Sequence, residues 1–183
     1  MLTHARPGRT VSGTPPPLQE IPLPLALAEF NSASAAELRP MLTACLAVRR
    51  WVDTVLEGRP YADFAALSTR ADSATPLHRN EIRDAIAAHP RIGERPSGKG
   101  SDADWSRSEQ SGVDNADEFA AANAEYEARF GHVFLVCASG RSGEELLANL
   151  RSRLGNDPDT ELDVAGAELA KIAQLRLAKA VTA

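Results

Sequence analysis

A series of strong helix start and stop signals constrains the fold of this 183-residue sequence more than any other feature. Ser34-Ala35-Ala36-Glu37 and Ser142-Gly143-Glu144-Glu145 both match the capping box, in which Ser and Glu side chains accept hydrogen bonds from each other's backbone N–H groups. Gly58, Gly131 and Gly155 stand where helices are expected to end. Apolar residues recur at helical spacing between these signals, which favours an all-α protein.

The predicted helices fill most of the chain. They are a helix opened by Ser34 that Pro40 kinks or restarts, one around Trp51–Leu56, one around Phe64–Leu67, one from Thr75 to His89, and three more over about 114–130, 142–155 and 160–181. Val133–Val136 is short, apolar and β-branched, and with no partner strand apparent it is predicted to be a buried extended connector. The predicted fold class is therefore all-α, a compact single-domain helical bundle.

Composition divides the chain into a tail and one domain. Residues 1–20 are rich in Pro, Gly, Ser and Thr and are predicted to be a flexible tail, and residues 21–183 are long enough to form one domain with a substantial core. The formal net charge of −5 argues against nucleic acid as a partner, and no apolar run is long enough to span a membrane. Two cysteines and no signal-peptide pattern predict a cytoplasmic protein.

His89 is the first residue that suggests chemistry. It follows Ile82 and Ile86 at helical offsets, so all three share one apolar face. The helix is expected to start at Thr75-Pro76 and to end before Pro90, because proline pushes the preceding residue out of the helical region. Two interpretations stay open, a core histidine that donates to a backbone carbonyl and a group that transfers protons near neutral pH.

Arg176 is the second such residue, because it interrupts the apolar face of the last predicted helix. That face is formed by Leu162, Ala165, Leu169, Ile172, Ala173 and Ala180. A buried guanidinium without a partner costs several kcal/mol, so Arg176 needs an anionic group. The partner can be an acidic side chain of the core, or a carboxylate or polarised carbonyl of a ligand.

Several stretches together resemble the 2-oxo-4-hydroxy-4-carboxy-5-ureidoimidazoline (OHCU) decarboxylase family, over roughly residues 23 to 180. The matching stretches are Phe30-Asn31, Cys45 through Trp51, Arg59-Pro60, Ala88 through Gly93, Ser106 through Gln110, Asn123 through Tyr126, Phe130-Gly131, Phe134 through Ala138, Arg153 through Asn156 and Leu175-Arg176-Leu177. Their common order and spacing carry the resemblance. Arg91-Ile92-Gly93 departs from the family, many of whose members carry an Asp-Leu-Ala type of sequence there.

The resemblance implies an all-helical enzyme, cofactor-free and commonly a homodimer, that converts OHCU to (S)-allantoin and CO₂ during urate breakdown. Its substrate would be a small-molecule ureide. By the same resemblance the catalytic residues would be His89 and Glu109, and the substrate-binding residues would be Pro90, Ser106, Gln110, Phe134, Leu135, Val136 and Arg176. The substrate's own ring can accept the electrons that CO₂ leaves behind, so neither a metal nor an organic cofactor is expected.

Three other functions are weighed against this one. A Cys–His hydrolase would use Cys137, but a cysteine at the end of an apolar run is more often a core residue. A metal site would draw on His78, His89 and His132, which lack any metal-binding spacing. The third alternative is a catalytically silent helical interaction module of the same fold.

Overall fold

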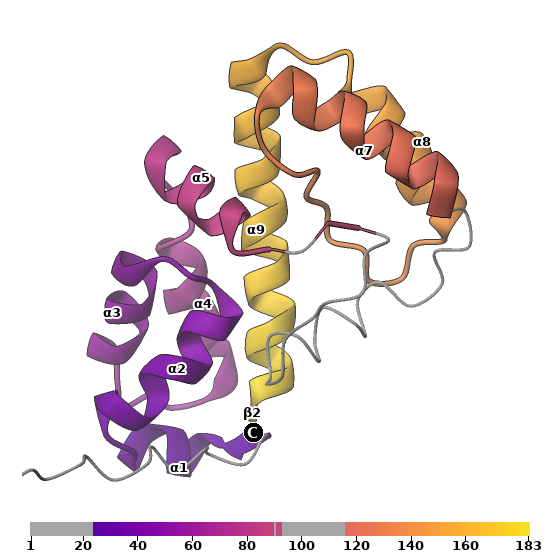
Figure 1. Cartoon of the computed structure of the whole chain (residues 1–183). Coiled ribbons are helices and arrows are strands. Elements are labelled where there is room, and N and C mark those ends of the chain that lie inside the picture. Colours follow the sequence, from indigo (N-terminus) through magenta and orange to yellow (C-terminus); the bar gives the residue numbers. More distant parts are fainter. Residues whose placement is uncertain (1–23, 90, 93–115) are drawn as a thin grey trace, which may run out of the picture.

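A long helix, α9 (Pro158–Ala180), runs through the middle of the molecule, with helices on two sides of it (Figure 1). The structure is a computed structural model that describes residues 24–89, 91–92 and 116–183. Asp157 caps α9 by accepting the backbone N–H groups of Asp159 and Thr160 at 3.1 and 3.0 Å, and Pro158 occupies the first turn. The helix predicted over about 160–181 is thus confirmed.

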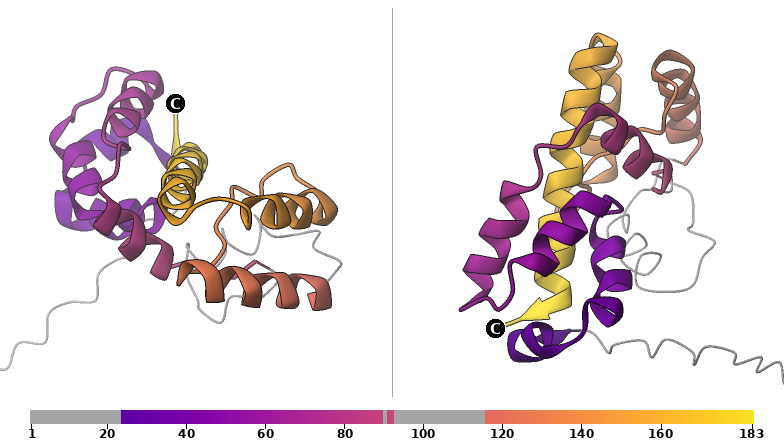
Figure 2. Two further views of the ribbon diagram at one scale, coloured as in Figure 1. Left: turned by 90° about the horizontal axis from the view of Figure 1, so that it is seen from above. Right: turned by 90° about the vertical axis from the view of Figure 1, so that its left-hand side faces the viewer.

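The first group of elements covers one side of α9 (Figure 2). It comprises β1 (Leu25–Ala26), α1 (Leu27–Ser32), α2 (Ala35–Cys45), α3 (Arg49–Glu57), α4 (Phe64–Ser73) and α5 (Arg79–Ala87). The predicted capping box at Ser34 is formed, and α2 continues through Pro40 without a restart. α2, α4 and α5 contact α9 directly, and their buried apolar side chains make one core with it.

The second group consists of α7 (Ala116–Phe130) and α8 (Gly143–Arg153), which contact each other on the other side of α9 (Figure 2). Ser142 forms the second predicted capping box, with Glu145. Gly131 follows α7 with a φ of 74°, a left-handed conformation that glycine adopts without strain. A second core of buried apolar side chains, which includes Phe119 and Leu150, fills the space between these helices.

The segment 133–138, called the connector below, lies between the two cores and contributes side chains to both. Val133, Leu135 and Cys137 pack against the core around α9, whereas Phe134, Val136 and Ala138 belong to the core of α7 and α8. Side chains that alternate between two faces are the mark of an extended backbone. The prediction of a buried extended connector is confirmed.

Two features of the first group differ from prediction. β1 pairs in parallel with β2 (Val181–Thr182), with Leu25 opposite Val181, and this short pair was not predicted. The helix expected to begin at Thr75-Pro76 begins instead at Arg79, after the cap residue His78. The backbone N–H of His78 donates to the Glu81 carboxylate.

The Thr75 hydroxyl serves the preceding helix, since it donates to the Asp72 carbonyl at 2.7 Å. Arg50 of α3 then fixes the turn by donating to the carbonyl oxygens of Ala74 and Pro76 and to Glu81. The described residues remain all-α apart from the β1–β2 pair, and no helix among them is long and apolar enough to cross a membrane. The predicted tail, residues 1–20, lies outside the described part of the chain.

Candidate active site

His89 lies just beyond the end of α5, held by that helix's last turn. Its backbone N–H donates to the Ile86 carbonyl at 2.9 Å, and its Nδ1 lies 2.8 Å from the Ala85 carbonyl oxygen. A carbonyl oxygen only accepts, so Nδ1 carries a proton. Nε2, which is shielded from solvent, is then the ring nitrogen that can take up or release a proton. The contact expected of a core histidine is present, and it also fixes the tautomer that proton transfer requires.

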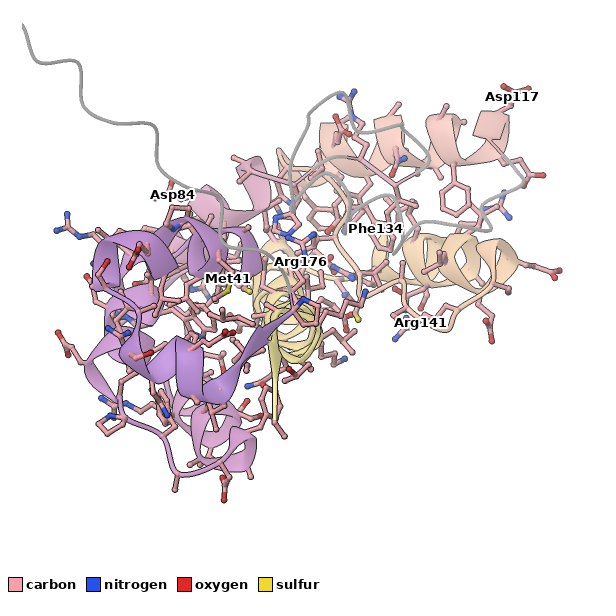
Figure 3. All side chains as sticks on the ribbon, turned by 90° about the horizontal axis from the view of Figure 1, so that it is seen from below. Met41, Asp84, Asp117, Phe134, Arg141 and Arg176 are labelled. Atoms are coloured by element: carbon pink, nitrogen blue, oxygen red, sulfur yellow. The ribbon has the colours of Figure 1, made fainter. Side chains whose placement is uncertain are left out.

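Arg176 is among the most deeply buried charged side chains, with 1% of its surface exposed. Its Nη1 donates to the carbonyl oxygen of Ala44 at 2.8 Å, in the last turn of α2. Carbonyls in a last turn carry the negative end of the helix dipole, which stabilises the guanidinium. In Figure 3, Arg176 and Phe134 both lie in the middle of the molecule, between the two groups of helices.

The connector contains three residues that were predicted to line the pocket. All three are buried: Phe134, Leu135 and Val136. Leu135 shares one hydrophobic core with Ile86 of α5 and Ala173 of α9. Each of these two residues is three positions from a predicted site residue, His89 and Arg176 respectively. The connector, the end of α5 and the C-terminal half of α9 thus border the same hydrophobic core.

A buried polar cluster that sequence reasoning missed supports the connector from α8 and α9. Glu161, which is 0% exposed, accepts hydrogen bonds from the Tyr126 hydroxyl, from Arg153 and, at 2.7 Å, from the Asn156 side chain. Burial, with the hydrogen bond to Glu161 as a further cause, raises the pKa of the Tyr126 phenol. Arg153 also stacks over the Phe134 ring, 4.8 Å from its centroid. The cluster therefore joins α7, α8, α9 and the connector.

Four predicted site residues, Pro90, Ser106, Glu109 and Gln110, lie outside the described residues. Cys137, the candidate nucleophile of the hydrolase alternative, packs against the core around α9, and its backbone N–H donates to Glu168 at 2.8 Å. Over the described ranges, no group of three or more His, Cys, Asp or Glu side chains is placed to hold a metal ion.

An open cavity of about 430 Å³ lies between α5 and the end of α7 and is lined in part by Ile86, Phe130 and His132. Two of its polar side chains are engaged: Glu127 pairs with Arg91, and His132 Nδ1 lies 3.1 Å from the Val133 carbonyl oxygen. No predicted site residue that the structure describes is among the residues lining it. His89, Arg176 and the connector stay the predicted site.

Comparison with known proteins identifies the family of this chain. The profile of one family, OHCU decarboxylase, matches residues 31–178, which include every predicted site residue. The chain belongs to the OHCU decarboxylase family. The resemblance inferred from the sequence is thus confirmed, and the predicted fold class accords with it.

The names of two relatives refer to uric acid degradation and to OHCU decarboxylation. The uric acid degradation bifunctional protein TTL of Arabidopsis thaliana is 40% identical over 105 residues, 52% of this chain and 32% of that protein. The OHCU decarboxylase of Amia calva is 36% identical over 134 residues, 67% of this chain and 75% of that protein. The chain thus spans about a third of the length of the Arabidopsis relative and three quarters of the length of the Amia calva one.

A crystal structure of an OHCU decarboxylase in the presence of (S)-allantoin shares the fold. It superposes with a TM-score of 0.64 at 28% sequence identity, and the match covers 80% of this chain and 97% of that one.

Proposed function

We propose that this chain decarboxylates OHCU to (S)-allantoin and CO₂, without a cofactor, in urate breakdown. The observation that carries the proposal is the family match over residues 31–178. The names of the relatives and the crystal structure obtained with (S)-allantoin support it. Arg176, which is buried, and His89, which is half-buried with its Nδ1 held by the Ala85 carbonyl, are groups suited to the chemistry.

The reaction breaks one C–C bond and then forms one C–H bond. The substrate holds a carboxylate and a hydroxyl on the same ring carbon, and the electron pair left by CO₂ passes to the neighbouring ring carbon, which bears the ureido group. The hydroxyl loses its proton as its own carbon becomes a ring carbonyl, and a proton must reach one face of the ureido-bearing carbon to give a single enantiomer. His89 suits the proton transfers because its Nδ1–H is held by Ala85, which leaves Nε2 as the exchanging position.

Arg176 is proposed to bind the substrate through its guanidinium, because a carboxylate or polarised carbonyl matches its fork of N–H donors. Backbone N–H and C=O groups of the connector are proposed to pair with the ureide, which has donors and acceptors of its own. Glu109 is proposed as the acidic companion of His89, and Pro90, Ser106 and Gln110 as substrate contacts, on the family resemblance alone. A homodimer and a cytoplasmic location likewise stay predictions.

The experiment that tests the proposal follows freshly generated urate oxidation products by circular dichroism, with and without the protein. We expect the protein to accelerate the appearance of (S)-allantoin and the release of CO₂, and His89→Asn to abolish most of the acceleration. Equal rates and optical purity with and without the wild-type chain would refute the proposal. They would favour the alternative, a catalytically silent interaction module of the same fold.

A further inference from the structure

The connector is held along one backbone edge by two buried charged side chains. The first is Arg153, whose Nη1 donates to the Leu135 carbonyl oxygen at 2.7 Å. Arg153 is itself fixed by an ion pair with Glu161 and by its stacking on Phe134. A guanidinium held on three sides has few alternative positions, so the Leu135 carbonyl is held with it.

The second holding group is Glu168 of α9, which is 6% exposed. One carboxylate oxygen accepts the Cys137 backbone N–H at 2.8 Å, and the other accepts the Lys171 ammonium at 2.6 Å. Burial alone raises the pKa of the Glu168 carboxyl, but the hydrogen bonds from Lys171 and Cys137 outweigh it and lower that pKa. Glu168 is therefore ionised at neutral pH, and its hydrogen bond to the connector is charge-assisted.

These two contacts determine which way the backbone of Val136 faces. The N–H and C=O of a trans peptide point in opposite directions, so fixing the Leu135 carbonyl turns the Val136 N–H to the other side. Fixing the Cys137 N–H turns the Val136 carbonyl to that same side. Among the described residues, neither backbone group of Val136 has a hydrogen-bond partner. In an extended segment both groups then project from one edge.

We propose that Glu168 and Arg153 are positioning residues that hold Val136 so that its N–H and C=O bind one amide edge of the ureide together. The inference deepens the proposed function and rests on it. An amide edge of a ureide ring offers an N–H beside a C=O, and two antiparallel hydrogen bonds to one extended residue match that pair. The side chains of Glu168 and Arg153 fix the direction in which the backbone N–H and C=O of Val136 point, and the substrate supplies their hydrogen-bond partners.

α9 sets the position of this edge relative to Arg176. Glu161 and Glu168 are two turns apart on α9, so they lie on nearly the same face, roughly 10 Å from each other. Arg176 follows two turns further along the same helix. The single helix α9 thus carries Arg176, which is proposed to bind the substrate. It also carries Glu168, which holds the connector directly, and Glu161, which holds it through Arg153.

The test uses variants of Glu168 in the full chain. Glu168→Ala removes the acceptor of the Cys137 N–H, and we expect KM for OHCU to rise about tenfold, the effect of roughly one lost hydrogen bond, with kcat changed less than about threefold. Glu168→Gln keeps an acceptor oxygen and is expected to restore KM to within about threefold of wild type. Lys171→Met is the matched control, because it removes the ion pair and leaves the backbone contact in place.

A merely structural role would lower the melting temperature without this division between KM and kcat. The inference would be overturned if KM were unchanged in Glu168→Ala, or if KM in Glu168→Gln were as high as in Glu168→Ala. In either case an active wild type would still uphold the proposed function. An inactive wild type would instead refute the proposed function itself.

A second measurement needs no variant and applies even where Glu168→Ala does not fold. On titration of ¹⁵N-labelled wild type with (S)-allantoin, we expect the Val136 amide proton to shift downfield as it gains a hydrogen bond. A saturating titration that leaves this resonance in place would overturn the inference.

Discussion

Replacing Arg176 with methionine separates its two possible roles, a ligand of the substrate and a partner in an internal ion pair. Methionine keeps much of the apolar stem of the side chain and removes the guanidinium, so the variant leaves a smaller cavity than alanine would. Arg176 is 1% exposed, and one hydrogen bond of its guanidinium goes to the Ala44 carbonyl at 2.8 Å.

The expected stability change is small because two effects oppose each other. Loss of a hydrogen bond from a charged donor costs about 1.5–3 kcal/mol. Against it, removing a buried cation relieves a desolvation penalty of several kcal/mol. We therefore expect the free energy of unfolding of Arg176→Met to stay within about 2 kcal/mol of wild type. Binding has no such compensation, and loss of a charge-assisted contact to the substrate is expected to raise KM by roughly tenfold to 150-fold.

Urea denaturation gives the stability change, and initial rates with OHCU give KM and kcat. Titration with (S)-allantoin, followed by the rise in melting temperature, gives an independent measure of affinity. Loss of about 3–5 kcal/mol of stability with full affinity for (S)-allantoin would contradict the reasoning, because that cost is typical of breaking a buried ion pair.

Three further predictions follow from the site. His89→Asn is expected to lower kcat by about 10² or more, the usual effect of losing a general acid–base group, while circular dichroism shows an unchanged fold. Cys137→Ser is expected to retain activity because Cys137 packs against a core, and complete inactivation of a folded variant would revive the hydrolase alternative. Because the pKa of Glu168 is lowered in the folded state, its stabilising contribution is present above the ordinary value and lost as pH falls through the folded-state pKa. Urea titrations are therefore expected to show a smaller loss of stability on acidification in Glu168→Gln than in wild type.

Signals that act over a few residues were enough to predict most of the helices. The capping boxes at Ser34 and Ser142 and the glycine after α7 mark helix ends, because these residues satisfy their own turn's backbone groups. The alternation of the connector's side chains between two cores explains why an extended prediction for Val133–Val136 succeeded.

The errors came from contacts between residues far apart in the chain. Thr75-Pro76 has the composition of a helix start, but Arg50 of α3 holds the carbonyls on either side of Thr75 in a turn. The pairing of Leu25 with Val181 brings the two ends of the described chain together, and two-residue strands leave no periodicity to detect. Neither outcome can be derived before the tertiary arrangement is known.

The candidate site shows the same division between local and distant causes. The helical wheel of α9 identified Arg176 as a buried charge, and the same wheel places Glu161 and Glu168 at the flank of that face, where both are buried. What the wheel does not show is their partners, because Arg153, Tyr126 and the Cys137 N–H reach α9 from α8, α7 and the connector. A buried carboxylate on a helix costs stability unless such partners arrive. We therefore propose a role for each of the three buried charges of α9. Glu168 holds the connector directly, Glu161 holds it through Arg153, and Arg176 binds the substrate.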